Sequence, residues 1–245
     1  MKKRFLGVLL SVAMVAAVLA GCGSSGAKET AAPAGSETEA ASEAASGETE
    51  AAGNTGDVIT VGFSQVGAES DWRTANSESM KSTFSTENGY NLIFDDAQQK
   101  QENQIAAIRN FIQQEVDYIV LAPVTESGWD TVLQEAKDAE IPVIIVDRMV
   151  NVSDDSLYTA WVGSNFKLEG QKACEWLKQY AAAKNMSEVN IVDIQGTIGA
   201  SAQIGRTEAL NEAVEANGWN LLAQQTGEFT QAKGQEVMES ILKQY

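Results

Sequence analysis

The residues best suited to hold a ligand are Asp147 and Arg148, which end a run of aliphatic residues. Val143 to Val146 are four consecutive aliphatic residues, all of them β-branched, as is typical of a strand in a parallel sheet covered by helices. Ligands of open α/β sheets bind outside the carboxyl ends of such strands. A carboxylate acceptor beside a forked guanidinium donor suits a ligand rich in hydroxyl groups. From these two residues alone, a solvent-facing ion pair remains the alternative.

The composition argues against several classes of function. The formal net charge is −17, so a nucleic acid is not expected as a partner, because neutralising phosphates needs a basic face. The chain contains no histidine, which removes the commonest general base and the commonest metal ligand. We therefore expect no metal, no cofactor and no catalysis. The less favoured enzyme hypothesis is a glycosidase that pairs Asp95 and Asp96 with Asp147.

The elements that position this pair alternate between strand and helix. Each predicted strand is short and apolar, and each predicted helix places its apolar residues on one face, as Ile108 and Phe111 illustrate. Asp71 and Ser127 are the predicted caps of two helices, and Gly89 is a predicted stop. The pattern predicts a parallel, doubly wound sheet. Its strands are expected at residues 58–64, 92–94, 118–122 and 143–146, and its helices at 72–88, 100–114 and 127–139, the last with Trp129, Val132, Leu133 and Ala136 inward.

A second alternation follows a strand-like run at residues 157–163. Helices are predicted at residues 166–183, 199–217 and from 233 onward, and strands at 189–194 and 219–225. The first of these helices is expected to turn Phe166, Ala173, Trp176, Leu177 and Tyr180 toward a core, and Cys174 is expected to be a small packing residue. We predict an α/β protein of two Rossmann-like lobes, residues 58–162 and 163–245, joined by a hinge with a cleft between them. Because the last helix stops in mid-pattern, we expect a fragment whose second lobe is truncated.

The first 57 residues have the features of an export signal and a tether. Lys2, Lys3 and Arg4 precede an apolar run of secretory length, which ends in Leu19-Ala20-Gly21-Cys22. This ending resembles the lipobox of bacterial lipoproteins, so we predict a signal peptide at residues 1–21 and lipidation of Cys22. An ordinary signal peptide with a chance cysteine is the alternative. Residues 22–57 lack large aliphatic side chains and are rich in glutamate, which predicts a disordered acidic tether.

Several segments, spread from Ile59 to the last residue, resemble one family. These segments are similar to the periplasmic sugar-binding proteins of ABC importers, in the branch of the ribose-binding protein, and within it to galactofuranose-binding proteins. They are Val61-Gly62-Phe63-Ser64-Gln65-Val66-Gly67, Glu69-Ser70-Asp71-Trp72-Arg73, Gln98-Gln99-Lys100-Gln101-Glu102-Asn103-Gln104, Ala136-Lys137-Asp138-Ala139-Glu140-Ile141-Pro142, Asp147-Arg148, Gln195-Gly196-Thr197-Ile198-Gly199-Ala200-Ser201 and Val237-Met238-Glu239-Ser240.

The resemblance implies a set of sugar contacts. Aromatic rings suit the apolar face of a sugar, and the charged residues form hydrogen bonds with its hydroxyls. By themselves, Trp72 could be a core residue, Ser64 a turn residue and Arg206 a solvated helix residue, while Asn165 could serve the hinge or the pocket. Thr230-Gln231 depart from the family's Asp-Arg, and the family's remaining contacts would lie beyond Tyr245. The implied contacts are Ser64, Trp72, Arg73, Asp147, Arg148, Asn165, Arg206 and Phe229.

The resemblance also implies a function and a location. We expect a monomeric solute-binding protein that captures a monosaccharide, galactofuranose or a related furanose or pentose, for the permease and ATPase of an ABC transporter. It would be exported and held on the outer face of the cell membrane by its lipid anchor alone, in the periplasm if the organism has two membranes. The alternative is a sensor that presents its ligand to a chemoreceptor or a membrane kinase.

Overall fold

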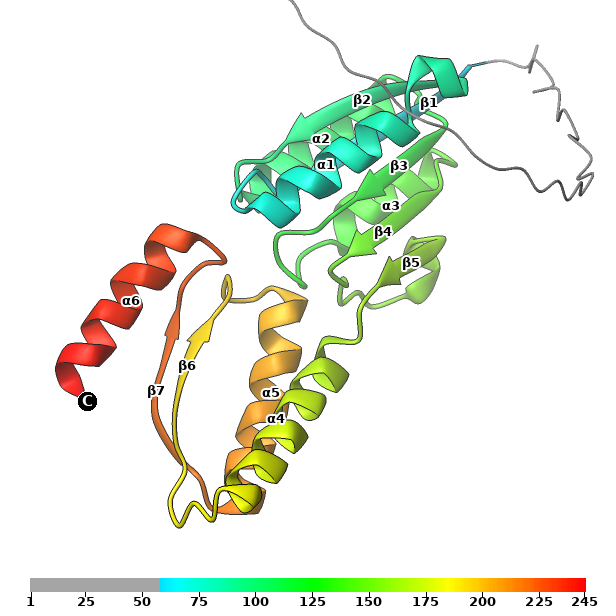
Figure 1. Ribbon diagram of the computed structural model, residues 1–245. Coiled ribbons are helices and arrows are strands. Elements are labelled where there is room, and N and C mark those ends of the chain that lie inside the picture. Colours follow the sequence, from blue (N-terminus) through cyan, green and yellow to red (C-terminus); the bar gives the residue numbers. More distant parts are fainter. Residues whose placement is uncertain (1–57) are drawn as a thin grey trace, which may run out of the picture. The chain divides into compact units, whose positions relative to one another are not determined.

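The structure is a computed structural model that describes residues 58–245 (Figure 1). These residues belong to one compact unit. The predicted signal peptide, Cys22 and the tether lie outside the described residues. Among residues 58–245, no helix has both the length and the apolar character that crossing a membrane requires.

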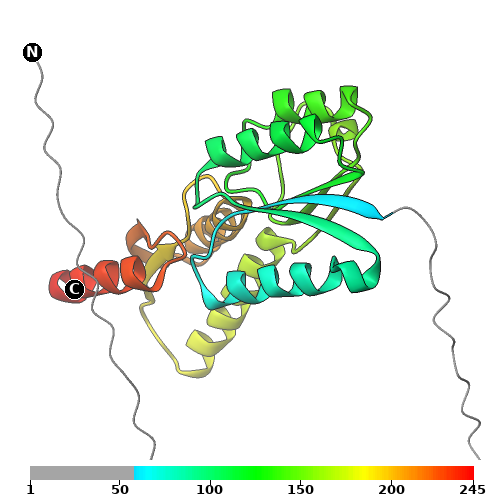
Figure 2. The ribbon, with the colours of Figure 1, turned by 90° about the horizontal axis from the view of Figure 1, so that it is seen from above.

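The first lobe is built on a five-stranded parallel sheet. Three helices alternate with its first four strands, and the order β2-β1-β3-β4-β5 is that of a doubly wound fold. Figure 2 shows α1 on one face of the sheet and α2 and α3 on the other. The predicted parallel, doubly wound sheet is confirmed. The elements are β1 (Ile59–Gln65), α1 (Asp71–Thr83), β2 (Tyr90–Asp96), α2 (Gln101–Gln113), β3 (Tyr118–Leu121), α3 (Asp130–Asp138), β4 (Val143–Asp147) and β5 (Ala160–Gly163).

Each face of this sheet has its own apolar core. On the α2 and α3 face, Ile108, Trp129 and Ile145 are fully buried, together with the other predicted inward residues of α3. On the α1 face, Phe63 is fully buried and meets Phe94 edge to face at 5.7 Å between ring centroids. Because both faces are covered, the strands are held firmly and their carboxyl ends have fixed positions.

Three helix boundaries differ from the prediction. Ser70, not Asp71, caps α1, since its hydroxyl oxygen accepts the backbone N–H of Arg73 at 3.2 Å. The helix then ends at Thr83 rather than at residue 88, and a separate 3-10 turn, η1 (Thr86–Asn88), follows it and is closed by Gly89 at φ 85°. Ser127 does not cap α3, because Gly128 turns the chain at φ 92° and the helix begins only at Asp130.

The second lobe contains a parallel pair of strands and three helices. The elements follow the predicted order: α4 (Phe166–Ala183), β6 (Asn190–Gln195), α5 (Ser201–Asn217), β7 (Asn220–Thr226) and α6 (Gln231–Gln244). Helices α4 and α5 pack closely because Gly170 of α4 faces Ala209 and Arg206 of α5, where a Cβ atom would not fit. The strand-like run at residues 157–163 is shorter than predicted, since Leu157 belongs to a 3-10 turn, η2 (Asp155–Leu157).

The predicted inner face of α4 is partly wrong. Trp176 and Tyr180 are 62% and 44% exposed, and their rings stack on each other at 5.2 Å. Ala173 is also exposed. The buried stripe of this helix consists instead of Phe166, Gly170, Cys174 and Ala181. Small residues at this spacing let α4 approach α5, so the larger aromatic rings lie on the opposite side.

Candidate ligand-binding site

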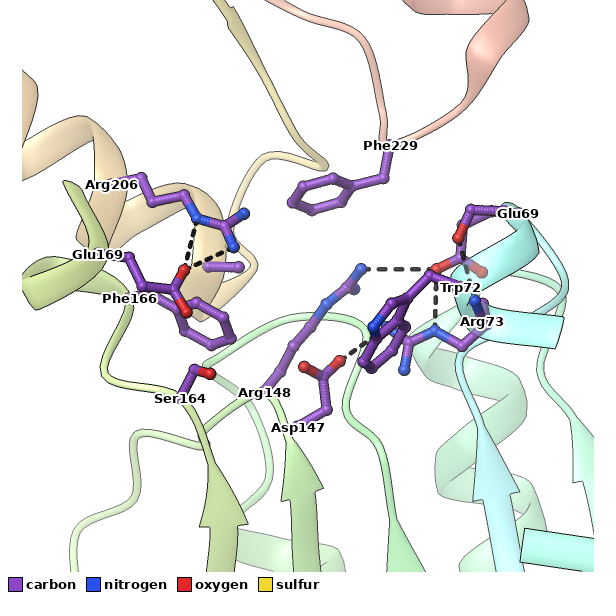
Figure 3. Close-up of a pocket in the computed structure, with 12 residues that line it drawn as sticks. Glu69, Trp72, Arg73, Asp147, Arg148, Ser164, Phe166, Glu169, Arg206 and Phe229 are labelled. Carbon is purple, nitrogen blue, oxygen red and sulfur yellow. Dashed lines mark hydrogen bonds and ion pairs between the residues drawn. The ribbon is translucent and has the colours of Figure 1, made fainter. Parts of the chain in front are cut away.

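A pocket of about 360 Å³ lies where the first sheet ends and the second lobe begins (Figure 3). Six of the eight predicted contact residues line it, and they come from segments far apart in the sequence. The first-lobe side comes from the segment that follows β1, including the first turn of α1, and from the end of β4, as expected outside the carboxyl ends of the strands of an open α/β sheet. The lining residues are Glu69, Ser70, Trp72, Arg73, Asp147, Arg148, Ser164, Phe166, Glu169, Ala202, Arg206 and Phe229.

The first-lobe side of the pocket is a buried network of charges. Arg73 donates from Nε to Glu69 Oε1 at 3.1 Å and from Nη2 to Asp147 Oδ2 at 2.9 Å. The side chains of Arg73, Glu69 and Asp147 are 3%, 2% and 17% exposed. Two buried atoms, Glu69 Oε2 and Arg73 Nη1, have no hydrogen-bond partner. Charges buried in this way are costly unless they stay paired, so the geometry of the network is strongly constrained.

Asp147 occupies an unusual backbone conformation at the end of β4. Its φ is 62°, in the left-handed region that aspartate tolerates better than most residues. The carbonyl oxygen of Asp147 accepts the indole N–H of Trp161 at 3.3 Å. Gly163 is paired with Asp147 across the sheet, and a Cβ atom at Gly163 would overlap that same carbonyl oxygen. The conformation therefore depends on a glycine in the neighbouring strand.

Arg148 is buried between the two lobes. Its Nη1 donates to the carbonyl oxygen of Val124 at 3.1 Å, and its Nη2 lies 3.7 Å from Glu69 Oε1. The Phe229 ring lies over the guanidinium, with 4.9 Å from Cζ to the ring centroid. Burial, with a smaller contribution from the charge of Arg73, lowers the pKa of Arg148 to about 10. The guanidinium therefore stays protonated at neutral pH.

The second-lobe side is a single, half-exposed ion pair. Arg206 on α5 donates to Glu169 Oε2 on α4 from Nε at 3.1 Å and from Nη2 at 2.8 Å. Its guanidinium also lies over the ring of Phe166, 5.0 Å from the centroid. The two charged side chains are 46% and 40% exposed. Arg206 is thus a pocket residue held by a partner, and not a freely solvated helix residue.

Besides Phe166, two aromatic rings line the pocket, Trp72 from the first lobe and Phe229 from the second. Trp72 is 58% exposed and lies beside Arg73, with 4.9 Å from Cζ to the ring centroid. Its exposure excludes the alternative that Trp72 is a core residue at the start of α1. Phe229 extends from the loop between β7 and α6, where both it and Glu228 adopt positive φ. The ring passes so close to Gly196 that no larger residue fits there unless the ring moves.

Ser64 and Asn165 do not line this pocket. Ser64 is fully buried in β1, and its hydroxyl donates to Asp95 Oδ1 at 3.4 Å. The Asn165 side chain accepts the backbone N–H of Leu168 at 2.9 Å and so caps α4. In this conformation neither side chain can reach a ligand in the pocket. Asn165 is instead part of the segment that joins the two lobes.

The carboxylate pair of the glycosidase hypothesis is not assembled either. Asp95 is bonded to Ser64, and burial raises its pKa. Asp96 accepts the backbone N–H of Gln98 at 2.9 Å. Only Asp147 of the three lines the pocket. Within residues 58–245, no cluster of three histidine, cysteine or carboxylate side chains could hold a metal ion.

Sequence reasoning missed several lining residues, of which the two glutamates matter most. Glu69 lies four residues before Arg73, and that spacing was an available signal for an ion pair. Glu169 is 37 residues from Arg206, and only the packing of α4 on α5 brings them together. No local pattern identifies such a pair. Phe166 was predicted as a core residue, and it serves both the core and the pocket.

Comparison with known proteins now places the chain. A family profile described as periplasmic binding protein domain matches residues 61–245. The chain belongs to the periplasmic binding protein family. The predicted family resemblance is confirmed, and so is the α/β fold with its parallel sheet.

The relatives include proteins named for sugars. The galactofuranose-binding protein YtfQ of Escherichia coli is 47% identical over 186 residues, which are 76% of this chain and 57% of that protein. The ribose import binding protein RbsB of Salmonella typhimurium is 29% identical over 154 residues, 63% of this chain and 50% of that protein. The chain thus spans about half the length of these relatives. They are binding proteins and not enzymes, which agrees with the expectation of no catalysis.

Solved structures with a bound sugar are among those that this chain resembles. The periplasmic binding protein component of an arabinose ABC transporter from Shewanella sp. ANA-3, bound to α- and β-L-arabinofuranose, is 50% identical to this chain. Its structure superposes with a TM-score of 0.69 over 76% of this chain and 60% of that one.

Proposed function

We propose that this protein captures a monosaccharide in its furanose form, galactofuranose or a related furanose, for an ABC transporter. The observation that supports this most is that Arg73, Asp147 and Arg148 lie together in one pocket. The rings of Trp72 and Phe229 line the same pocket. The names of the relatives, which include galactofuranose and arabinofuranose binders, favour a furanose.

The chemistry of the pocket suits a small polyol. Its volume of about 360 Å³ lies at the lower end of the range for ligand pockets, roughly 300–1,000 Å³. Arginine donates hydrogen bonds and carboxylate accepts them, so a hydroxyl group can satisfy both at once. Each hydrogen bond to a charged group contributes roughly 1.5–3 kcal/mol net. Ring faces of tryptophan and phenylalanine suit the C–H face of a sugar.

The residues that line the pocket come from both lobes, which supports capture of the sugar between them. Trp72, Arg73, Asp147 and Arg148 belong to the first lobe, whereas Arg206 and Phe229 belong to the second. A sugar that contacts both groups favours the conformation in which both are available. The permease and ATPase of the transporter would then receive sugar from the closed, monomeric protein.

We further propose that Cys22 is lipidated and that residues 22–57 tether the folded part to the outer face of the membrane. The sequence motif supports this, because the basic residues, the apolar run and Leu19-Ala20-Gly21-Cys22 occur in the order of a lipoprotein signal. Replacing Cys22 by serine should release the protein from the membrane fraction. Membrane association that is unchanged in this variant would contradict the anchor.

The sugar itself is tested by calorimetric titration of the full gene product with galactofuranose, L-arabinose, ribose and methyl galactopyranoside, which is locked in the six-membered form. We expect heat of binding with sugars that populate a furanose and none with the locked pyranoside. Binding of the pyranoside alone would contradict the furanose proposal, and heat from none of the four would contradict sugar capture. Loss of uptake of the bound sugar on deletion of the gene tests transport.

A further inference from the structure

The pocket is electrically balanced although the chain is strongly acidic. Six of its twelve lining residues are ionisable, three arginines and three carboxylates, whereas the whole chain has a formal charge of −17. Each arginine has a carboxylate partner: Glu69 and Asp147 for Arg73, Glu69 for Arg148 and Glu169 for Arg206. Each arginine of the pocket therefore has its charge offset by a carboxylate, although one nitrogen of Arg73, Nη1, has no hydrogen-bond partner.

A neutral sugar and an anionic sugar would form different hydrogen bonds with the charged residues of this pocket. A hydroxyl group can accept from an arginine and donate to that arginine's carboxylate, so it fits between paired charges. A carboxylate group only accepts and a phosphate group mainly accepts, and either would have to displace the resident carboxylate while losing its own hydration. Rejection by an unfavourable charge is a common source of specificity.

Glu169 is the partner whose removal would expose an arginine without disturbing the fold. Its side chain is 40% exposed, whereas that of Glu69 is 2% exposed and contacts two buried arginines. Arg206 would keep its place because it also lies over the ring of Phe166 at 5.0 Å. A free guanidinium in a fixed position is the geometry that binds carboxylate or phosphate through two parallel hydrogen bonds.

We propose that Glu169 is a specificity-determining residue: by pairing with Arg206, it excludes anionic sugars such as uronic acids and sugar phosphates from the pocket. The claim about neutral sugars rests on the proposed function. The claim about anions does not, because it concerns only the charges that line the pocket.

The chain offers a closely matched control for this residue. Glu135 pairs with Arg109 at similar exposure, with contacts of 2.7 and 2.8 Å to its two carboxylate oxygens and side chains 38% and 50% exposed. This pair joins α2 and α3 on the outside of the first lobe and does not line the pocket. Glu135→Gln therefore changes the net charge as Glu169→Gln does, and frees an arginine, but elsewhere.

The test is calorimetric titration of the unmodified protein, Glu169→Gln, Glu135→Gln and Glu169→Asp with D-galacturonate, inorganic phosphate and L-arabinose at low salt. We expect Glu169→Gln to bind galacturonate and phosphate at least about tenfold more tightly than the other three proteins, a difference of ~1.4 kcal/mol. Glu169→Asp keeps the charge and should still exclude both anions.

Two results would overturn the inference. One is that the unmodified protein binds galacturonate as tightly as L-arabinose. The other is that Glu169→Gln gains no more affinity for the anions than Glu135→Gln does. If the anions behave as predicted but the unmodified protein binds no neutral sugar, the proposed sugar-binding function fails while the role of Glu169 stands.

Discussion

The two sides of the pocket use the same chemistry at very different burial. On the first-lobe side, Arg73 and Asp147 are 3% and 17% exposed, and on the second-lobe side Arg206 and Glu169 are 46% and 40% exposed. An exposed ion pair contributes ~0–1 kcal/mol to stability, whereas removing one partner of a buried pair costs ~3–5 kcal/mol. The first-lobe side is therefore part of the folded core, while the second-lobe side can rearrange when a ligand arrives.

The scaffolds explain this difference. The first lobe has five strands with helices on both faces, so the ends of β1 and β4 are fixed. The second lobe has two strands among the described residues, and most residues of β6 and β7 are only half-buried. Contacts that hold a ligand in one orientation are thus expected from the first lobe, and contacts that adapt to it from the second.

The largest expected effect is a difference in the free energy of unfolding between variants of Glu69 and Glu169. Glu69→Gln should lower the free energy of unfolding by ~3–5 kcal/mol, because it leaves Arg73 and Arg148 with Asp147 as their one carboxylate partner. Glu169→Gln should lower it by less than about 1 kcal/mol. Urea denaturation followed by tryptophan fluorescence measures both. Equal effects of the two substitutions would contradict the comparison between the lobes.

The next effect concerns the affinity of the first-lobe side for sugar. Asp147→Asn keeps the shape of the side chain and tolerates the φ of 62°, but it removes a charged acceptor. Sugar affinity should fall by about 10- to 100-fold, which corresponds to ~1.5–3 kcal/mol. Calorimetry measures the change, with Asp138→Asn on the exposed face of α3 as the control. An unchanged affinity would show that Asp147 does not contact the sugar.

Substitutions at Gly163 and Gly196 test whether the first-lobe side of the pocket is more rigid than the second-lobe side. Gly163→Ala forces a Cβ atom against the backbone of Asp147, which cannot move without disturbing the sheet, and should cost ~1–3 kcal/mol of stability. Gly196→Ala meets only the far end of the Phe229 ring, so it should cost less stability while it moves the ring away from Arg148 and weakens sugar binding. Thermal unfolding and calorimetry together distinguish the two. The reverse order of stabilities would count against the account.

The smallest effect is expected at a contact between the lobes. The Ser201 hydroxyl oxygen accepts the backbone N–H of Met149 at 2.8 Å. Ser201→Ala should cost ~1 kcal/mol and weaken sugar binding about fivefold, because the lobes lose one hydrogen bond that holds them together. Ser82→Ala on the exposed face of α1 is the control. A Ser201→Ala variant with unchanged affinity would show that this bond does not favour the binding conformation.

Periodicity and strand ends predicted the framework of the protein well. The order of elements, the parallel sheet and the position of Asp147 and Arg148 at a strand end all follow from local patterns, and α4 agrees with its predicted bounds. Local sequence patterns failed to predict features that depend on packing between segments distant in the sequence. The outward position of Trp176 and Tyr180 depends on which side of α4 meets α5, and the pairing of Arg206 with Glu169 depends on that same contact.

A crystal structure of the full gene product with L-arabinose tests the central claim most directly. We expect the sugar between the rings of Trp72 and Phe229, with hydroxyl groups within hydrogen-bond distance of both Asp147 and Arg148. A sugar bound elsewhere, or a sugar in this pocket that touches neither of these two residues, would contradict the account.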